Sequence, residues 1–99
     1  MKIKQTKKFK RELKKLAKKH FPVKVLIPCL KAIIEQDKPS LIKIKDHALT
    51  GSWSDYREFH PARYGNYGKA FDNWIVVYKI NQDELILLLV TTGNHDILG

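Results

Sequence analysis

The chain has 99 residues, of which 43% are hydrophobic, and this length fits one domain with a modest core. Its single cysteine, Cys29, excludes an intrachain disulfide and a CxxC metal site. No apolar run approaches the ~20 residues that span a bilayer, and no apolar signal-peptide segment follows the charged N-terminus. We therefore expect one soluble, cytoplasmic domain over residues 1–99, without a membrane partner.

Positive charge is concentrated at the N-terminus. Residues 1–24 contain eleven lysines and arginines against one acid, Glu12, whereas residues 25–99 contain eight against nine. The first segment therefore carries a net +10 and the remainder −1, within a total of +9. Such a field costs self-repulsion, so we expect a polyanionic partner. The alternative is a solvated lysine-rich helix face that binds nothing.

The N-terminal third predicts a short strand and two helices. Residues 1–5 alternate in polarity, as an edge strand does. Apolar residues then recur at helical spacing over residues 7–20, which indicates a helix that Pro22 ends. Residues 26–34 show a second apolar helical face. Pro28 either lies in the first turn of this helix or kinks a longer one that begins near Pro22.

The rest of the chain favours strands. We expect residues 37–51 to be irregular, and residues 52–60 alternate well enough for a strand. The apolar runs at 74–80 and 85–90, separated by the turn NQDE, predict an antiparallel hairpin. The resulting order, β-α-α-β-β-β, is an α+β fold in which two N-terminal helices pack on a small antiparallel sheet.

A long loop, residues 61–73, precedes the hairpin. It interleaves Arg63 and Lys69 with glycines and aromatic residues. Long loops in compact domains are often functional, and this mixture of charge and aromatic rings can bind single-stranded nucleic acid. A flexible, soluble loop without a ligand is an equally good interpretation.

Histidine positions suggest a site at one end of the sheet. His60 ends one predicted strand, Asp72 begins the next, and His95 follows the last strand. In an antiparallel meander these three points are adjacent, whereas His47 precedes the strands and is not placed by topology. Imidazoles and a carboxylate can act as general acid and base, each contributing ~10²–10⁴ in rate. With a polyanionic substrate, the reaction they suit is RNA cleavage by the 2′-OH, which needs no metal.

Structural roles are the simpler interpretation of any single histidine. A site of two histidines and an aspartate could bind a metal, but the sequence has no HxH or HxxxH spacing. His20, at the end of a lysine-rich helix, is best explained as a favourable C-terminal charge or as a surface residue without a role.

Four segments together resemble a known family: DHALTG, GSWSDYREFH, DNWIVVYK and TTGNHDIL. They match the spaced motifs of the YafQ group in the RelE/ParE toxin superfamily, and the element order matches over nearly the whole chain. The resemblance implies a RelE-like microbial RNase fold and a type II toxin–antitoxin function, that of a ribosome-dependent, metal-independent mRNA endonuclease without a cofactor. The implied partners are mRNA in the ribosomal A site, the ribosome with its rRNA, and a cognate antitoxin protein.

Site residues follow from the resemblance position by position. The four residues implied in catalysis are His47, His60, Asp72 and His95. Residues expected to bind RNA come from the motifs, the long loop and the N-terminal helix: Arg57, Trp74, Arg63, Lys69, Lys7, Lys8, Lys10, Arg11, Lys14, Lys15 and Lys18.

The sequence departs from the family pattern at three places. The ending DILG lacks the family's aromatic residue, and Asn73 separates Asp72 from Trp74 in a longer loop. Thr91 stands where the family usually has an arginine that would stabilise phosphate charge. Either one of three other cations takes that role, Arg57, Arg63 or Lys69, or activity is reduced.

Two other functions fit the same fold. One is a non-catalytic toxin like the gyrase-poisoning ParE relatives, which lack these histidines, and the other is a plain RNA-binding protein. Because fold does not decide activity, individual His→Ala changes are what separates the nuclease from both.

Overall fold

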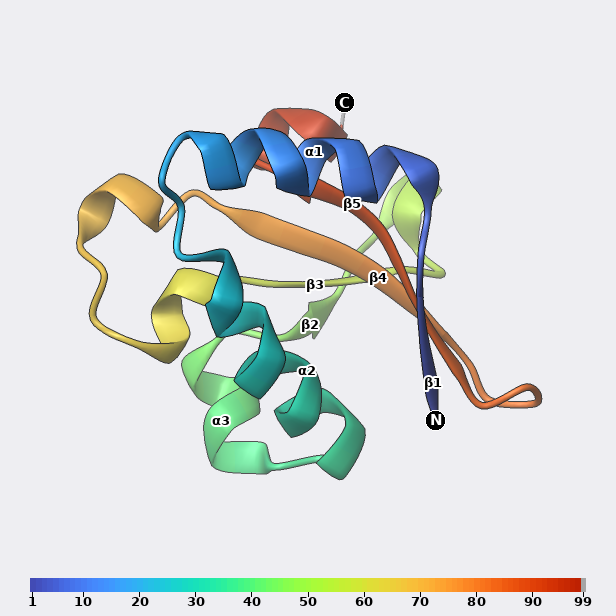
Figure 1. Cartoon of the computed structure of the whole chain (residues 1–99). Coiled ribbons are helices and arrows are strands. Elements are labelled where there is room, and N and C mark those ends of the chain that lie inside the picture. The colour runs from blue at the N-terminus through green and yellow to red at the C-terminus, as the bar shows by residue number, and fades with distance from the viewer. Residues whose placement is uncertain (99) are drawn as a thin grey trace.

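A five-stranded sheet in the order β1-β5-β4-β3-β2 forms the centre of the structure, a computed structural model that describes residues 1–98 (Figure 1). Its strands are β1 (Lys2–Gln5), β2 (His47–Ala48), β3 (Arg57–Phe59), β4 (Ile75–Asn81) and β5 (Ile86–Gly93). The α+β prediction is confirmed, but the sheet is mixed: β1 runs parallel to β5, and the other pairs are antiparallel. No hairpin turn joins β1 to β5, so no turn imposes an antiparallel direction on that pair.

Three helices accompany the sheet: α1 (Lys7–Lys18), α2 (Leu26–Glu35) and α3 (Lys38–Lys43). Thr6 caps α1, because its Oγ1 accepts the N–H of Phe9 at 3.0 Å and donates to the carbonyl of Val90 at 2.6 Å. Pro28 lies in the first turn of α2, where a missing N–H costs nothing, and a separate turn, η1 (Val23–Val25), precedes that helix. None of the helices in residues 1–98 is long and apolar enough to cross a membrane.

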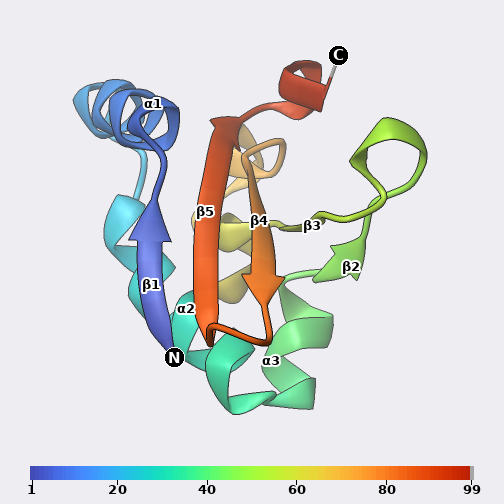
Figure 2. The same cartoon turned by 90° about the vertical axis from the view of Figure 1, so that its right-hand side faces the viewer.

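The helices occupy two different places around the sheet. Figures 1 and 2 show α2 and α3 on one side of it, whereas α1 lies along β5. The chain leaves β5 into the C-terminal turn η5 (His95–Leu98), which lies at the same end of the sheet as α1, on the other side of β5 (Figure 2). One end of the sheet is therefore bordered by a basic helix and by the turn that carries His95.

The hydrophobic core lies between the sheet, α1 and α2. Its fully buried side chains include Phe9, Cys29, Ile33, Phe59, Tyr78 and Leu87. Each large apolar side chain contributes about 1.5–3 kcal/mol when it is removed from water. Burial also raises the pKa of the Cys29 thiol to about 12, so this cysteine packs as an apolar residue.

The segment between α2 and β4 differs from the prediction in two ways. Its first part contains regular elements, and its second part contains a turn where a strand was predicted. Residues 37–51 contain α3 and β2 rather than only irregular chain, because Pro39 fits the first turn of α3. Residues 52–56 are not a strand: Gly51 has φ 64°, and a turn, η2 (Gly51–Trp53), starts there. Only Arg57–Phe59 pair as β3.

The long loop is ordered by two short turns. These are η3 (Pro61–Tyr64) and η4 (Lys69–Phe71). Phe71 packs edge-on against Phe21, with ring centroids 4.9 Å apart, so the loop is attached to the segment after α1. This attachment holds Asp72 beside the end of β3.

Candidate active site

Three histidines converge on the buried carboxylate of Glu58 in β3. Nε2 of His47 lies 3.2 Å from Glu58 Oε1, and Nε2 of His95 lies 3.2 Å from Oε2. Nε2 of His60 lies 3.8 Å from the same Oε2. The Glu58 side chain is 4% exposed, whereas those of His47 and His95 are 49% and 51% exposed. The cluster is therefore a buried acid covered by imidazoles that solvent can reach.

Each histidine comes from a different element. His47 pairs directly with Glu58 across β2 and β3, so their side chains share one face of the sheet. His60 follows β3, and its N–H donates to the carbonyl of Ile44 at 2.7 Å. The ring centroid of His60 is 5.5 Å from that of His95 and 6.5 Å from that of His47. The structure thus brings together the two histidines that topology placed and the one that it did not.

Trp53 fastens the turn that carries His95. Its Nε1 donates to the carbonyl of Leu98 at 2.9 Å, and its ring contacts Tyr56 edge-on at 5.2 Å. The indole therefore joins η2 to η5, two segments far apart in the sequence. Because η5 has no strand partner of its own, this bond limits where His95 can lie.

The environment of His60 suits a proton acceptor. Burial lowers the pKa of its ring below the ordinary 6.5, so the ring is neutral at pH 7. Nδ1 lies 3.3 Å from the carbonyl of Asp72, which favours the tautomer that carries its hydrogen there. Nε2 then keeps a lone pair on the side of the cluster, where a base would use it.

The environment of His47 suits a proton donor. Its Nδ1 lies 2.6 Å from the carbonyl of Lys45, and its Nε2 faces the carboxylate of Glu58. Both of these partners are acceptors, so only the doubly protonated ring can donate to both. Its neighbour His95 also faces Glu58 and is equally exposed to solvent.

Asp72 contacts the site through its main chain. Its carbonyl meets His60, whereas its carboxylate Oδ1 lies 3.8 Å from Nε of Arg63. The side chain expected in catalysis is therefore turned towards the loop. Its structural contribution is to hold the tautomer and orientation of His60.

The whole chain, residues 1–99, matches the family of the bacterial toxin of type II toxin–antitoxin systems, YafQ. The chain belongs to the YafQ family. It is 28% identical over 87 residues to the mRNA interferase toxin YafQ of Escherichia coli (strain K12), a match that covers 88% of this chain and 83% of the relative.

Two solved structures have the same architecture. A metal-bound toxin from Helicobacter pylori is 33% identical, with a TM-score of 0.78 and coverage of 100% of this chain and 99% of that one. The Escherichia coli DinJ–YafQ toxin–antitoxin complex contains a chain that is 27% identical, with a TM-score of 0.71 and coverage of 97% and 93%. The resemblance in the sequence motifs is confirmed, and so is the RelE-like fold.

Within this YafQ-family chain, Arg57 belongs to a different polar network. Neighbouring residues of a strand face opposite sides of a sheet, so Arg57 points away from Glu58. Its Nη2 donates to Asp46 Oδ2 at 2.7 Å, and its Nε donates to the hydroxyl of Tyr78 at 3.3 Å. The Tyr78 hydroxyl also donates to Asp46. The expected phosphate contact of Arg57 is therefore not supported by its position.

Trp74 and Thr91 are both enclosed by the protein. Trp74 is 2% exposed, and its Nε1 donates to Thr92 Oγ1 at 2.8 Å, so its ring is not at a surface where RNA could stack. Thr91 donates to Glu12 Oε1 at 2.7 Å, and the N–H of Thr92 donates to the same oxygen at 3.2 Å. The single acid of the basic segment thus ties α1 to β5, and the position where the family usually has an arginine faces that helix.

The other cations expected to bind RNA lie at the surface. All seven basic residues predicted on α1 are exposed: Lys7, Lys8, Lys10, Arg11, Lys14, Lys15 and Lys18. Arg63 and Lys69 line a hollow of about 200 Å³ in the long loop, next to Asp72. Of the three candidates to replace the missing arginine, Arg63 is the one whose charge acts on the His60 ring.

Glu58, the central residue of the cluster, is not among the site residues predicted from the sequence. A period of two along a strand places Glu58 and His60 on one face, and this signal was available in YREFH. The predicted site residues lie at strand ends, whereas Glu58 lies within β3. Its burial also depends on partners from β2 and η5, which no local pattern reveals.

The cluster also has the composition of a metal site. Glu58, His60 and His95 each offer one ligand atom, and these atoms lie within 4.8 Å of one another. Imidazole and carboxylate are common ligands of zinc. Since His60 and His95 come from distant segments, the lack of HxH spacing does not exclude metal binding here.

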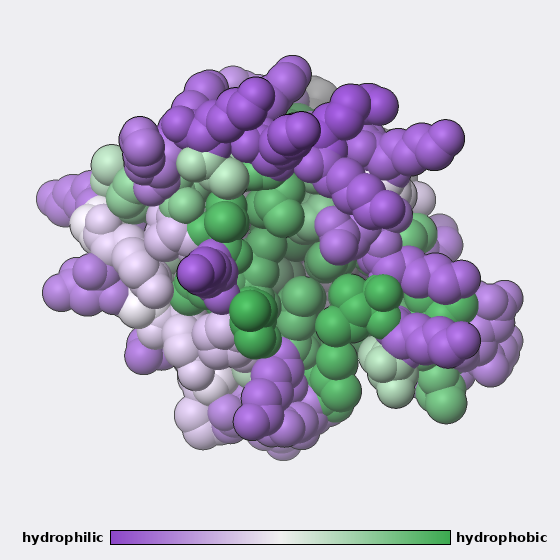
Figure 3. All heavy atoms as spheres, in the orientation of Figure 1, coloured by the Kyte–Doolittle hydropathy of each residue, from purple (hydrophilic) through white to green (hydrophobic). Residues whose placement is uncertain are grey.

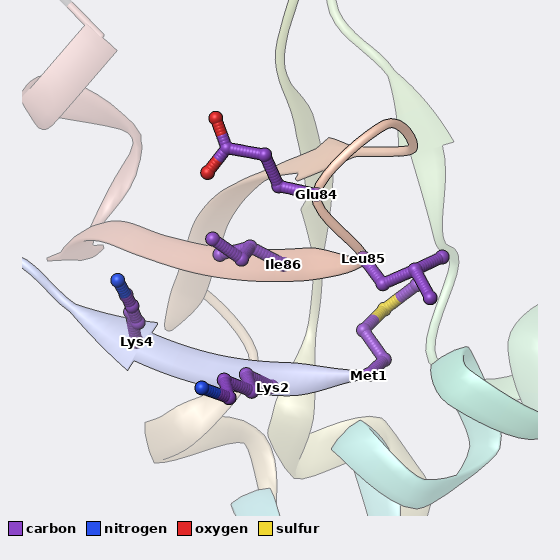
Figure 4. A pocket seen from close by; sticks show the side chains of 6 residues that line it. All are labelled: Met1, Lys2, Lys4, Glu84, Leu85 and Ile86. Carbon is purple, nitrogen blue, oxygen red and sulfur yellow. The ribbon is translucent and has the colours of Figure 1, made fainter.

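A second hollow, shown in Figure 4, lies at the opposite end of the sheet. Its volume is about 470 Å³, and its lining includes Lys2, Lys4 and Glu84 (Figure 4). β5 runs from Ile86 at this end to Gly93 beside the histidines, so the hollow is not part of the cluster.

Proposed function

We propose that this YafQ-family chain is a toxin that cleaves mRNA by general acid–base catalysis. The observation that carries the proposal is the convergence of His47, His60 and His95 on buried Glu58. The mRNA interferase name of the Escherichia coli relative supports the choice of substrate.

His60 acts as the base in this proposal. Its neutral ring accepts the proton of the ribose 2′-OH through Nε2 while the 2′-oxygen attacks the adjacent phosphorus. An imidazolium, His47 or His95, gives its proton to the departing 5′-oxygen. The products are a 2′,3′-cyclic phosphate and a 5′-OH end. Glu58 holds the acid in place, since its carboxylate lies 3.2 Å from both of these rings.

The cations of the long loop and of α1 bind the RNA backbone. Arg63 and Lys69 take the phosphates beside the cut, and the lysines of α1 dock on ribosomal RNA while the mRNA lies in the A site. Phosphate contacts supply affinity without sequence preference and weaken steeply with salt. We propose ribosome dependence because the seven exposed basic residues of α1 form a surface suited to ribosomal RNA.

The chemistry proposed here needs no metal. A transition metal bound by Glu58, His60 and His95 would instead occupy the nitrogens that move protons. Micromolar zinc is therefore expected to inhibit cleavage by the purified toxin, and a zinc chelator is expected to restore it. Stimulation by zinc would mean that the cluster is a catalytic metal centre.

Neutralisation would come from a cognate antitoxin, as the DinJ–YafQ complex suggests. The free edge of β1 can accept an added strand. A groove of about 280 Å³ beside it is lined by apolar residues of β1, α1 and α2, including Ile3, Leu13 and Ile27. Figure 3 shows apolar surface below the basic side chains of α1, a combination that suits an acidic amphipathic segment.

Mapping new 5′ ends on cellular mRNA by primer extension tests this function. We expect ends phased to the reading frame in cells that express the chain, and their loss in a His60→Ala/His95→Ala double variant. Growth arrest without new ends in both proteins would favour the non-catalytic ParE-like function. Ribosome binding without cleavage or arrest would favour a plain RNA-binding protein.

A further inference from the structure

A cavity of about 460 Å³ lies between the end of α1, the long loop and the C-terminal turn. Its apolar wall includes Leu16, Phe21 and Ile97, and its polar groups are those of Lys19, Asn73 and Asn94. Neither the acid–base chemistry nor the backbone contacts proposed above use these residues. Their combination of a flat aromatic wall with amides is the kind that nucleobases bind.

The apolar wall is held rigidly. The ring of Phe21 packs edge-on against Phe71 at 4.9 Å and against Trp74 at 5.6 Å. Trp74 is itself anchored by its bond to Thr92. A wall fixed in this way offers a planar ligand a surface without an ordering cost. Base–aromatic contacts of this sort are tolerant of sequence and common in single-strand binding.

The two amides supply what the wall lacks, which is selectivity. Oδ1 of Asn94 accepts the N–H of Asp96 at 2.9 Å, so this amide is oriented and its NH₂ group is left to donate. Asn73 is exposed in the turn that precedes β4. An amide that offers both a donor and an acceptor can pair with the edge of a base.

Two residues that line the cavity are chain neighbours of residues at the histidine cluster. Asn94 directly precedes His95, whose Nε2 contacts Glu58. Asn73 directly follows Asp72, whose carbonyl contacts His60. A nucleotide with its phosphate at the cluster would extend its neighbouring base along these two connections, towards the amides of Asn73 and Asn94. Lys19 also lines the cavity and offers a cation to a following phosphate.

We propose that this cavity binds the base of the nucleotide adjoining the scissile phosphate, and that Asn73 and Asn94 read the edge of that base. The inference rests on the proposed mRNA cleavage and adds a source of sequence preference to it. This preference comes from the chain itself, in addition to any codon constraint that a ribosome imposes.

Cleavage-site sequencing on cellular mRNA tests the reading of the base. In Asn73→Ala and Asn94→Asp variants, we expect cutting to continue while discrimination among the bases beside the cut falls about fivefold or more, as loss of an amide–base pair does. Asn94→Asp keeps the acceptor for Asp96. Gln82→Ala, an exposed amide change in the distant hairpin turn, is the matched control. Unchanged base preference in both variants would overturn the proposal.

Nucleotide binding to the purified wild-type chain separates this inference from the proposed function. We expect the side-chain amide signals of Asn73 and Asn94 to shift in NMR spectra on titration with the four nucleoside monophosphates, unequally among the bases. Such shifts in a protein that cuts no mRNA would retain the cavity and reject the nuclease. Cleavage without shifts from any of the four nucleotides would reject the cavity and retain the nuclease.

Discussion

Two polar networks occupy opposite faces of β3, one residue apart, and they differ in how completely their groups are paired. Around Arg57, the groups of Asp46 and Tyr78 satisfy one another by direct hydrogen bonds. Around Glu58, one carboxylate oxygen has no hydrogen bond, and two of the three histidines are half exposed. The paired network stabilises the fold. The network around Glu58 has polar groups that remain available to bind a ligand.

Loss of catalysis is the largest effect that the comparison predicts. His60→Ala should reduce mRNA cleavage by roughly 10²-fold or more, because it removes the base, while the melting temperature changes little. His20→Ala is the matched control, since His20 is exposed and follows α1. Both variants are compared with the wild type by their toxicity in cells and by mRNA cleavage with the purified protein. A fully active His60→Ala protein would make the Glu58 cluster structural.

Asp46→Ala tests the network around Arg57, on the opposite face of β3 from Glu58. It leaves the buried Tyr78 hydroxyl and the Arg57 guanidinium without their acceptor, which costs about 1–3 kcal/mol of stability. Cleavage per folded molecule should be unchanged. Urea unfolding and an activity assay on the same samples measure both quantities. A drop in activity without a drop in stability would show that Arg57 and its partners belong to the site after all.

Acid should weaken the fold through His60. Burial lowers the pKa of this ring below 6.5, so the unfolded chain binds a proton that the folded site resists. The stability that the neutral His60 ring contributes is fully present above its ordinary pKa of 6.5 and is lost as the pH falls below that value. The free energy of unfolding, measured in urea at pH 7.5 and at pH 5.5, should therefore fall less in His60→Gln than in the wild type. An equal fall in both would contradict the assignment of a neutral, buried ring.

Trp53→Phe should have the smallest effect. It keeps the aromatic packing on Tyr56 but removes the bond to the carbonyl of Leu98. The turn that carries His95 then loosens, and we expect cleavage to fall about 2–10-fold, with a stability loss near 1 kcal/mol. The His95 ring signals in NMR should broaden or shift. Unchanged signals would mean that other contacts hold the turn.

The sequence predicted the parts of the fold that depend on local patterns. The helical spacing around Phe9 and the hairpin from Ile75 to Gly93 are regular, so the strand and helix assignments there agree with the structure. The turn at residues 51–53 and the helix around Pro39 were missed because short elements depend on tertiary contacts. The parallel direction of β1 was missed for the same reason.

The sequence predicted the histidines of the candidate site but not Glu58, the carboxylate that they surround. Strand order was enough to bring His60 near His95. It was not enough to identify Glu58, because the burial of that carboxylate comes from β2 and η5, which are placed by long-range packing. The same limit explains Trp74, a motif residue that the structure places in the core.

The chemistry at the cut ends tests the central claim most directly. Attack by the 2′-oxygen, with histidines as acid and base, leaves a 2′,3′-cyclic phosphate on one fragment and a 5′-OH on the other. We predict these ends on mRNA cut by the purified chain with ribosomes, and their loss in the His60→Ala/His95→Ala double variant. Fragments that carry 3′-OH and 5′-phosphate ends would contradict the account, because they require an activated water instead of the ribose hydroxyl.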